Sequence, residues 1–150
     1  MLSTTETIER GSIAKVLRGL RIKHGHTAKA CARTIDSLQN ERAIALTNNI
    51  ASTHEQHLAE LDAKLAEYQG DKVAANKTSR ALRRFGAPLM LVRGEHSLLD
   101  ELLTKEQLLA LEYEHALSPL LSASGIEALI DTHFREISGA CDMLDAYLAD

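Results

Sequence analysis

The sequence predicts an all-α protein, a bundle of four helices arranged as two antiparallel hairpins. Two observations predict this class. Apolar residues recur with a period near 3.6 and not in strict alternation, and the only prolines are Pro88 and Pro119. The 150 residues are enough to bury a core without disulfides, so we expect a single domain over residues 1–150.

The first two helices are expected to form one hairpin. Glu6 and Glu9 give the first an acidic opening turn, and its apolar positions trace one face from about residue 6 to 37: Ile13, Val16, Leu17, Leu20, Ala28, Cys31, Ile35 and Leu38. The second runs from about Glu41 to Tyr68 and ends before Gly70. Because the connector between them is short, the two helices should be antiparallel neighbours.

The last two helices are expected after a long crossover. Residues 71–93 are rich in lysine and arginine and contain Gly86 and Pro88, which predicts a solvated crossover with one short helix near 77–92. The third long helix should span about 96–117, where Ser118 and Pro119 stop it. A turn containing Ser122, Ser124 and Gly125 then leads to a fourth helix over about 125–148.

Composition excludes several kinds of partner. A net charge of −4, an isoelectric point near 6.0 and an aromatic fraction of 3% argue against binding to nucleic acid or to an anionic membrane. The chain has no signal-peptide pattern and no run of 18 apolar residues, so a cytoplasmic location is expected. Cys31 and Cys141 lack a metal or redox spacing and are predicted to be reduced core thiols.

Each helix places ionisable side chains on its otherwise aliphatic inner face. By the i, i+3, i+4, i+7 rule these are His24 in the first helix, His54 and His57 in the second, Glu106 with Tyr113 in the third, and His133 and Glu136 at the margin of the fourth. Burying such groups is costly unless they find one another or a metal ion.

The expected heights of these residues along the bundle place them in two polar layers. Antiparallel pairing sets His24 opposite His54 and His57, and sets Glu106 opposite Glu136, at a rise of about 1.5 Å per residue. Imidazole and carboxylate at mid-bundle are the ligands of helical metal sites. A metal-free alternative is equally open, in which the buried groups hydrogen-bond to one another and fix the helix register.

The layout resembles the ferritin-like superfamily, and within it a bacterial family of small four-helix proteins of unknown function. The similarity covers most of the chain from about residue 8 and rests on VLRGLRIKHGHTAKACARTI, ALRRFGAPLMLVRGEHSLLDELLTKEQLLALEYEHAL and FREISGACDMLDAYL. The resemblance implies two helical hairpins joined by a long crossover and, in the wider superfamily, a dinuclear iron or manganese centre. Glu106 and Glu136 fall where that family carries acids, whereas the first helix has none between Glu9 and Asp36. This departure argues against oxidase or iron-storage activity.

Three hypotheses follow. The first is a non-enzymatic bundle that holds a transition metal (iron, manganese or zinc) or a degenerate, metal-free site, with the candidate ligands His24, His54, His57, Glu106, His133 and Glu136. The second is a metal-free bundle that forms a homodimer or binds a protein partner through the leucines of the third helix, from Leu98 to Leu111, which wrap wider than one seam needs. The third is an active di-metal oxidase.

Overall fold

The protein is all-α throughout the part of the chain that the computed structural model describes, residues 4–69, 94–117 and 125–150. Its helices are α1 (Thr4–Asp36), α2 (Glu41–Gln69), α4 (Glu95–Ala116) and α6 (Glu127–Ala149). Every predicted long helix is confirmed, and each boundary lies within two residues of its expected position. The short helix predicted near 77–92, the Gly70 cap and the turn predicted at 118–124 lie outside the described residues.

The α1–α2 turn is fixed by hydrogen bonds to backbone amides. Asn40 caps α2, because its Oδ1 accepts hydrogen bonds from the amides of Arg42 at 2.9 Å and Ala43 at 3.2 Å. Glu95, at the start of α4, accepts hydrogen bonds from the amides of Gln39 and Asn40, and these contacts lower the pKa of its carboxyl. The start of α4 therefore lies beside the turn of the first hairpin.

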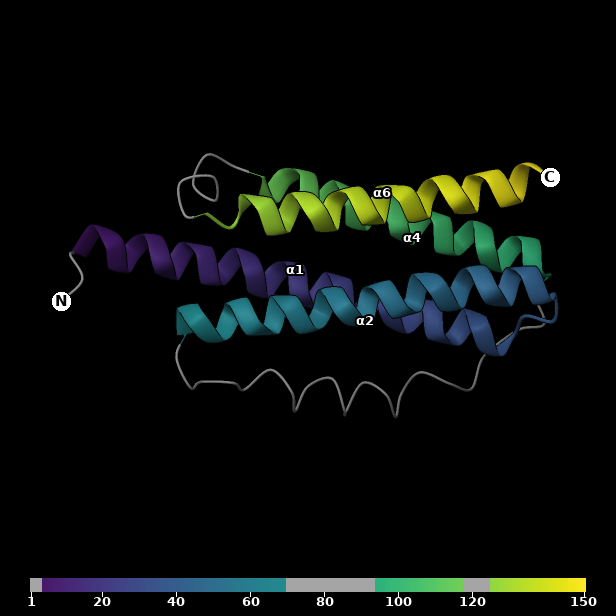
Figure 1. The fold of residues 1–150 in the computed structure, drawn as a ribbon, viewed down its shortest axis with the longest axis horizontal. Helices are drawn as coiled ribbons and strands as arrows, with labels where there is room; N and C mark the ends of the chain where they lie inside the picture. The colour runs from purple at the N-terminus through teal and green to yellow at the C-terminus, as the bar shows by residue number, and fades with distance from the viewer. Residues whose placement is uncertain (1–3, 70–93, 118–124) are drawn as a thin grey trace.

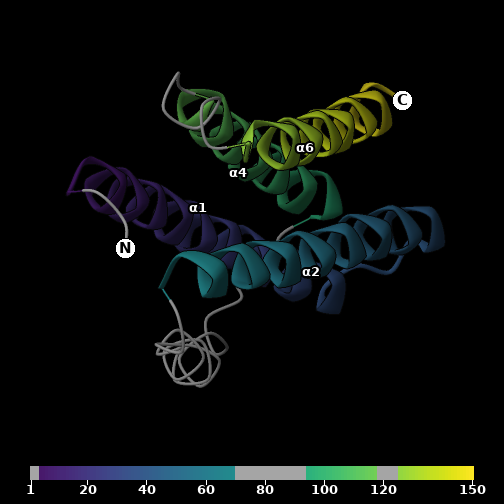
Figure 2. The same cartoon turned by 60° about the vertical axis from the view of Figure 1, so that its left-hand side comes forward.

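The four helices form two antiparallel hairpins, α1–α2 and α4–α6, that cross each other (Figures 1 and 2). Helix α4 also packs on α1, and α6 packs on α2. The antiparallel course of α1 and α2 follows from two contacts, since Arg10 donates to the Glu67 carbonyl and Cys31, further along α1, donates to the Thr47 carbonyl, nearer the start of α2. Lys23 of α1 pairs with Glu112 of α4. The end of α2 and the start of α4 lie at opposite ends of the bundle (Figure 1).

The apolar core has two halves. One lies toward the N-terminal end of α1 and the C-terminal end of α4, and its largest fully buried members are Leu17, Leu61, Tyr113, Ile126, Ile130 and Ile137. The other lies toward the α1–α2 turn and contains Cys31, Ile50, Leu99, Leu102, Ala140 and Leu144. Burial of these side chains drives the packing of the hairpins, at about 25 cal/mol per Å² of apolar surface. A layer of polar side chains lies between the two halves.

The leucines of α4 are less exposed than their sequence suggests. Five of the seven, namely Leu98, Leu99, Leu102, Leu103 and Leu109, are buried, and only Leu108 and Leu111 are exposed. The expected wide apolar face is therefore reduced to these two side chains, and self-association through it stays a prediction. None of the four described helices has the length and apolar character that a membrane crossing requires.

Both cysteines are free thiols, as predicted. Cys31 is fully buried, and its Sγ donates a hydrogen bond to the carbonyl of Thr47 at 3.4 Å. Burial, with a smaller contribution from Glu106, raises the pKa of Cys31 to about 12 and is the main cause of the rise to about 11 in Cys141. Both thiols are therefore protonated at neutral pH and behave as small core side chains.

Candidate metal centre

Five ionisable side chains are buried together between the two halves of the core: His24, His54, His57, Glu106 and His133, each at most 1% exposed. The buried threonines of the same region satisfy their hydroxyls on the preceding turn of their own helix, as Thr34 does on Ala30 and Thr47 on Ala43. The imidazoles and the carboxylate have no such local partner. Their hydrogen bonds must come from other helices, a ligand or water.

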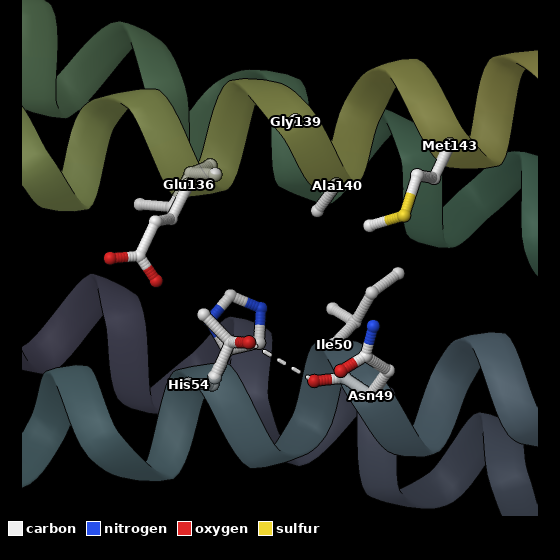
Figure 3. Close-up of a pocket in the computed structure, with 9 residues that line it drawn as sticks. Asn49, Ile50, His54, Glu136, Gly139, Ala140 and Met143 are labelled. Atoms are coloured by element: carbon white, nitrogen blue, oxygen red, sulfur yellow. Dashed lines mark hydrogen bonds between the residues drawn. The ribbon is translucent and has the colours of Figure 1, made fainter.

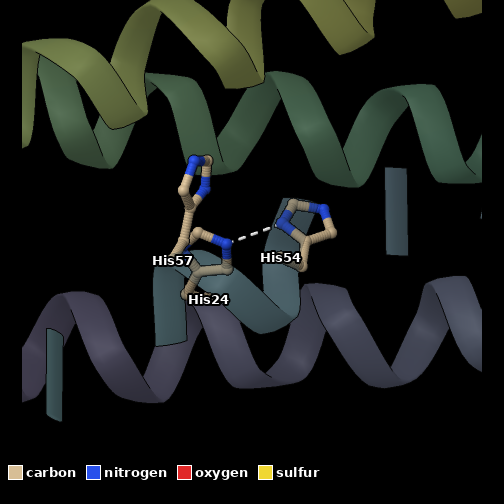
Figure 4. A group of neighbouring side chains, drawn as sticks. All are labelled: His24, His54 and His57. Atoms are coloured by element: carbon tan, nitrogen blue, oxygen red, sulfur yellow. Dashed lines mark hydrogen bonds between the residues drawn. The ribbon is translucent and has the colours of Figure 1, made fainter. Parts of the chain in front are cut away.

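All four helices contribute to this layer, which we call the histidine layer and define as His24, His54, His57, Glu106, Tyr113 and His133. Antiparallel pairing brings His24 of α1 level with His54 and His57 of α2, and level with Tyr113 of α4. The three imidazoles of α1 and α2 lie side by side, facing the opposite hairpin (Figure 4). The rings of His57 and His133 stack, with centroids 4.0 Å apart at 27°. The two layers predicted from the sequence are thus one.

A directed chain of hydrogen bonds runs through the layer. A carboxylate oxygen accepts, so His54 Nε2 donates to Glu106 Oε1 and leaves His54 Nδ1 as an acceptor. His24 Nε2 then donates to His54 Nδ1 at 2.6 Å, and the Tyr113 hydroxyl donates to His24 Nδ1 at 2.8 Å. His133 Nδ1 in turn donates to the Tyr113 oxygen at 3.1 Å. The chain assigns a tautomer to three of the four buried imidazoles.

Three buried polar atoms have no hydrogen-bond partner among the described residues: His57 Nδ1, Glu106 Oε2 and His133 Nε2. The tautomers explain two of them. His133 gives its one ring hydrogen to Tyr113, and His57 gives its own to Glu136 Oε2 at 3.3 Å, so each ring keeps a bare lone pair. Unpaired buried acceptors are uncommon in folded proteins and suggest a missing ligand or water.

Burial favours the neutral form of three imidazoles, those of His24, His57 and His133. Burial, reinforced by His54, lowers the pKa of His24 to about 2. Burial, with His57 beside it, lowers the pKa of His133 to about 4. Burial also lowers the pKa of His57, although Glu136 partly opposes the shift. Neutral imidazole is the form that binds metal ions, so these three rings need not be deprotonated before an ion binds at neutral pH.

The geometry of His24, His54 and His57 can hold a metal ion, because one ring nitrogen from each lies within 4.8 Å of the others. Nitrogen ligands of a tetrahedral ion lie about 3.3 Å apart when each metal–nitrogen bond is about 2.0–2.1 Å. The three nitrogens are therefore close enough to share an ion after small side-chain movements. The Glu106 carboxylate lies on the Nε2 side of the His54 ring and is not one of the three converging ligands.

Two glutamates lie at the rim of the layer, between α2 and α6. Glu136 has 42% of its side chain exposed and Glu60 has 37%. Glu136 contacts His57, and Glu60 Oε2 lies 3.6 Å from His133 Nε2. Glu136 was expected at the margin of its helix face and lies there, on the solvent side.

An open groove of about 190 Å³ reaches the layer from this rim (Figure 3). The buried His54 and the exposed Glu136 line it, and Ile50, Ala140 and Met143 line its apolar side. Gly139 also lines the groove, and a Cβ added there would meet no atom within 4 Å. The groove therefore opens onto His54, one of the candidate ligands.

The structure brings all six predicted candidate residues to one level of the bundle, five fully buried and Glu136 at the rim. Their role as ligands stays a prediction. Tyr113, predicted to lie on the inner face of its helix, is buried there, and its hydroxyl contacts His24 and His133. Glu60 was missed, although its spacing of three residues from His57 repeats that of His133 and Glu136.

Comparison of the chain with protein-family models, with curated proteins and with solved structures found no match. The resemblance to the ferritin-like superfamily therefore stays a prediction.

Proposed function

We propose that the protein binds a transition-metal ion within the histidine layer, with His24, His54 and His57 as its nitrogen ligands. The observation that carries the proposal is the convergence of three fully buried imidazoles from α1 and α2, whose ligand atoms lie within 4.8 Å of one another. An aliphatic bundle gains no stability from such a group of rings unless something occupies their lone pairs.

The donor set favours an ion that prefers nitrogen. Imidazole suits zinc, iron, copper and nickel, whereas manganese prefers oxygen ligands. Of the three metals considered from the sequence, zinc and iron therefore fit this inner position better than manganese. Glu106 accepts a hydrogen bond from His54 Nε2 and so orients that ring, as a partner outside the ligand set.

Ion binding requires a tautomer change in His24. His24 Nε2 and His54 Nδ1 share a hydrogen across 2.6 Å, a distance too short for two ligands of one ion. Binding therefore requires this hydrogen to move to His24 Nδ1, which faces the Tyr113 oxygen, and requires the two nitrogens to separate by about 0.7 Å, to the spacing of about 3.3 Å that an ion demands. Tyr113 holds the far side of the His24 ring throughout, through its hydroxyl.

A metal-free role is the second candidate, and the hydrogen-bond chain favours it. Tyr113, His24, His54 and Glu106 already satisfy four ring nitrogens without a ligand. Such a layer would fix the register of the two hairpins at a cost in stability, as buried polar residues do in some coiled coils. The three unpaired atoms are what this candidate does not explain.

The test uses protein expressed without a histidine tag. Metal content is measured after purification, and zinc binding is then measured by calorimetry on chelator-treated protein. His57→Leu is the informative variant, because His57 Nδ1 has no partner and the other nitrogen contacts a half-exposed glutamate, so the fold does not depend on this imidazole. His115→Gln, which removes an exposed imidazole from α4, is the matched control.

We expect wild type and His115→Gln to bind zinc alike, and His57→Leu to bind at least about tenfold more weakly. Equal zinc affinity in all three proteins, or no zinc binding by the wild type, would overturn the proposal and leave the metal-free candidate.

A further inference from the structure

Helices α2 and α6 carry the same short motif on facing surfaces. Helix α2 has His57-x-x-Glu60 and α6 has His133-x-x-Glu136. Residues three apart lie on the same face of a helix, one turn from each other. Because the two helices are antiparallel, each histidine lies opposite the glutamate of the other helix, with His57 beside Glu136 and His133 beside Glu60. The two rings stack between these crossed pairs.

The two crossed contacts differ in kind. His57 Nε2 lies 3.3 Å from Glu136 Oε2 and donates a hydrogen bond to it. His133 Nε2 lies 3.6 Å from Glu60 Oε2 and makes no hydrogen bond, although His133 is fully buried. The reason is that His133 gives its ring hydrogen to the Tyr113 oxygen, whose own hydrogen goes to His24. Two acceptors therefore face each other.

A cation between the two acceptors would resolve this contact. Ligands of one ion lie about 3.3 Å apart when metal bonds are near 2.1 Å, which is close to the 3.6 Å observed between His133 Nε2 and Glu60 Oε2. Glu136 lies one turn from His133 and is oriented by the hydrogen bond from His57, so a movement of its side chain would bring its carboxylate to the same ion. Both glutamates are partly exposed, which leaves room for water as further ligands.

We infer that the rim between α2 and α6 is a second divalent-cation site, formed by His133, Glu60 and Glu136. Its set of one imidazole and two carboxylates is richer in oxygen than the inner cluster and suits Mn²⁺ or Fe²⁺. The site uses none of the three inner ligands, so it does not depend on the inner site binding an ion.

The test measures Mn²⁺ binding to the full chain by the loss of the electron paramagnetic resonance signal of free Mn²⁺. Glu60→Gln removes one rim ligand and keeps the shape of the side chain. Glu55→Gln removes the same charge from an exposed position of the same helix and is the matched control. His54→Gln disables the inner cluster but retains an amide that can hydrogen-bond to Glu106.

We expect Glu60→Gln to weaken Mn²⁺ binding at least about tenfold, and Glu55→Gln and His54→Gln to bind like wild type. The inference is overturned if Glu60→Gln and Glu55→Gln bind alike, if His54→Gln loses Mn²⁺ as Glu60→Gln does, or if the wild type binds none. A wild-type protein that binds Mn²⁺ as expected but binds no zinc at the inner cluster would refute the proposed function and leave the rim site unaffected.

Discussion

Replacing His54 by leucine should destabilise the metal-free protein by about 4–6 kcal/mol. Glu106 is fully buried, and His54 is its one hydrogen-bond partner among the described residues. Stranding a buried carboxylate costs about 3–5 kcal/mol. His24 Nε2 also loses its acceptor, which adds about 1 kcal/mol. Leucine has a similar volume to histidine, so the cavity term should be small.

A second substitution in the same layer should restore most of this loss. In His54→Leu/Glu106→Leu the stranded carboxylate is gone, and only the unpaired His24 N–H remains. The double variant should therefore be more stable than His54→Leu by about 3–5 kcal/mol, the cost of the stranded carboxylate, which is opposite in sign to the usual effect of adding a core mutation.

The assay is urea unfolding followed by circular dichroism with a chelator present, which reports the free energy of unfolding and its dependence on denaturant. The reasoning is refuted if the double variant is less stable than His54→Leu, or if His54→Leu costs less than about 1 kcal/mol. Either result would mean that the two side chains do not depend on each other.

Three further outcomes are expected. Because the folded-state pKa of His24 is about 2 and that of His133 about 4, while an unfolded histidine has a pKa near 6.5, the unfolded chain binds more protons below pH 6.5. The contribution of these two histidines to the free energy of unfolding should be fully present above that pH and be lost on acidification. At about 1.4 kcal/mol per histidine and pH unit, the two together lose at most about 4 kcal/mol by about pH 5. A urea midpoint that does not change between neutral pH and about pH 5 would contradict this. Zinc binding at neutral pH should release almost no proton, because burial already keeps His24 and His57 neutral and the His24 hydrogen moves to Nδ1, so calorimetric enthalpies should not depend on the buffer; a release of about one proton would contradict this. Gly139→Leu, which fills the groove and raises helix propensity, should slow zinc uptake in stopped-flow measurements without changing affinity, whereas Gly19→Leu on α1 should not; equal rates would rule out this entry path.

The sequence was sufficient to predict the four helices and the buried histidines. A 3.6-residue period places His24, His54 and His57 on inner faces however the two hairpins pack together, because the period is a property of each helix by itself. How deep Glu136 lies, by contrast, depends on which helix covers that edge of α6. The helix period places it at the margin of a face but cannot say that α2 leaves it 42% exposed.

The relation between the two hairpins could not be read from periodicity. Heights within a hairpin follow from its short turn, but the offset of one hairpin against the other depends on packing between α1 and α4 and between α2 and α6. For this reason two polar layers were expected where one exists. Glu60 escaped notice for a related cause, since a half-exposed residue on an amphipathic helix is normally solvated and only its contact with His133 marks it.

X-ray absorption at the zinc edge of the untagged protein tests the central claim most directly. An ion bound by His24, His54 and His57 should show a shell of about three imidazole nitrogens near 2.0 Å, with the outer-shell scattering typical of histidine rings. The claim would be contradicted by a shell of oxygen ligands without histidine scattering. It would also be contradicted if the protein retained none of one added equivalent of zinc.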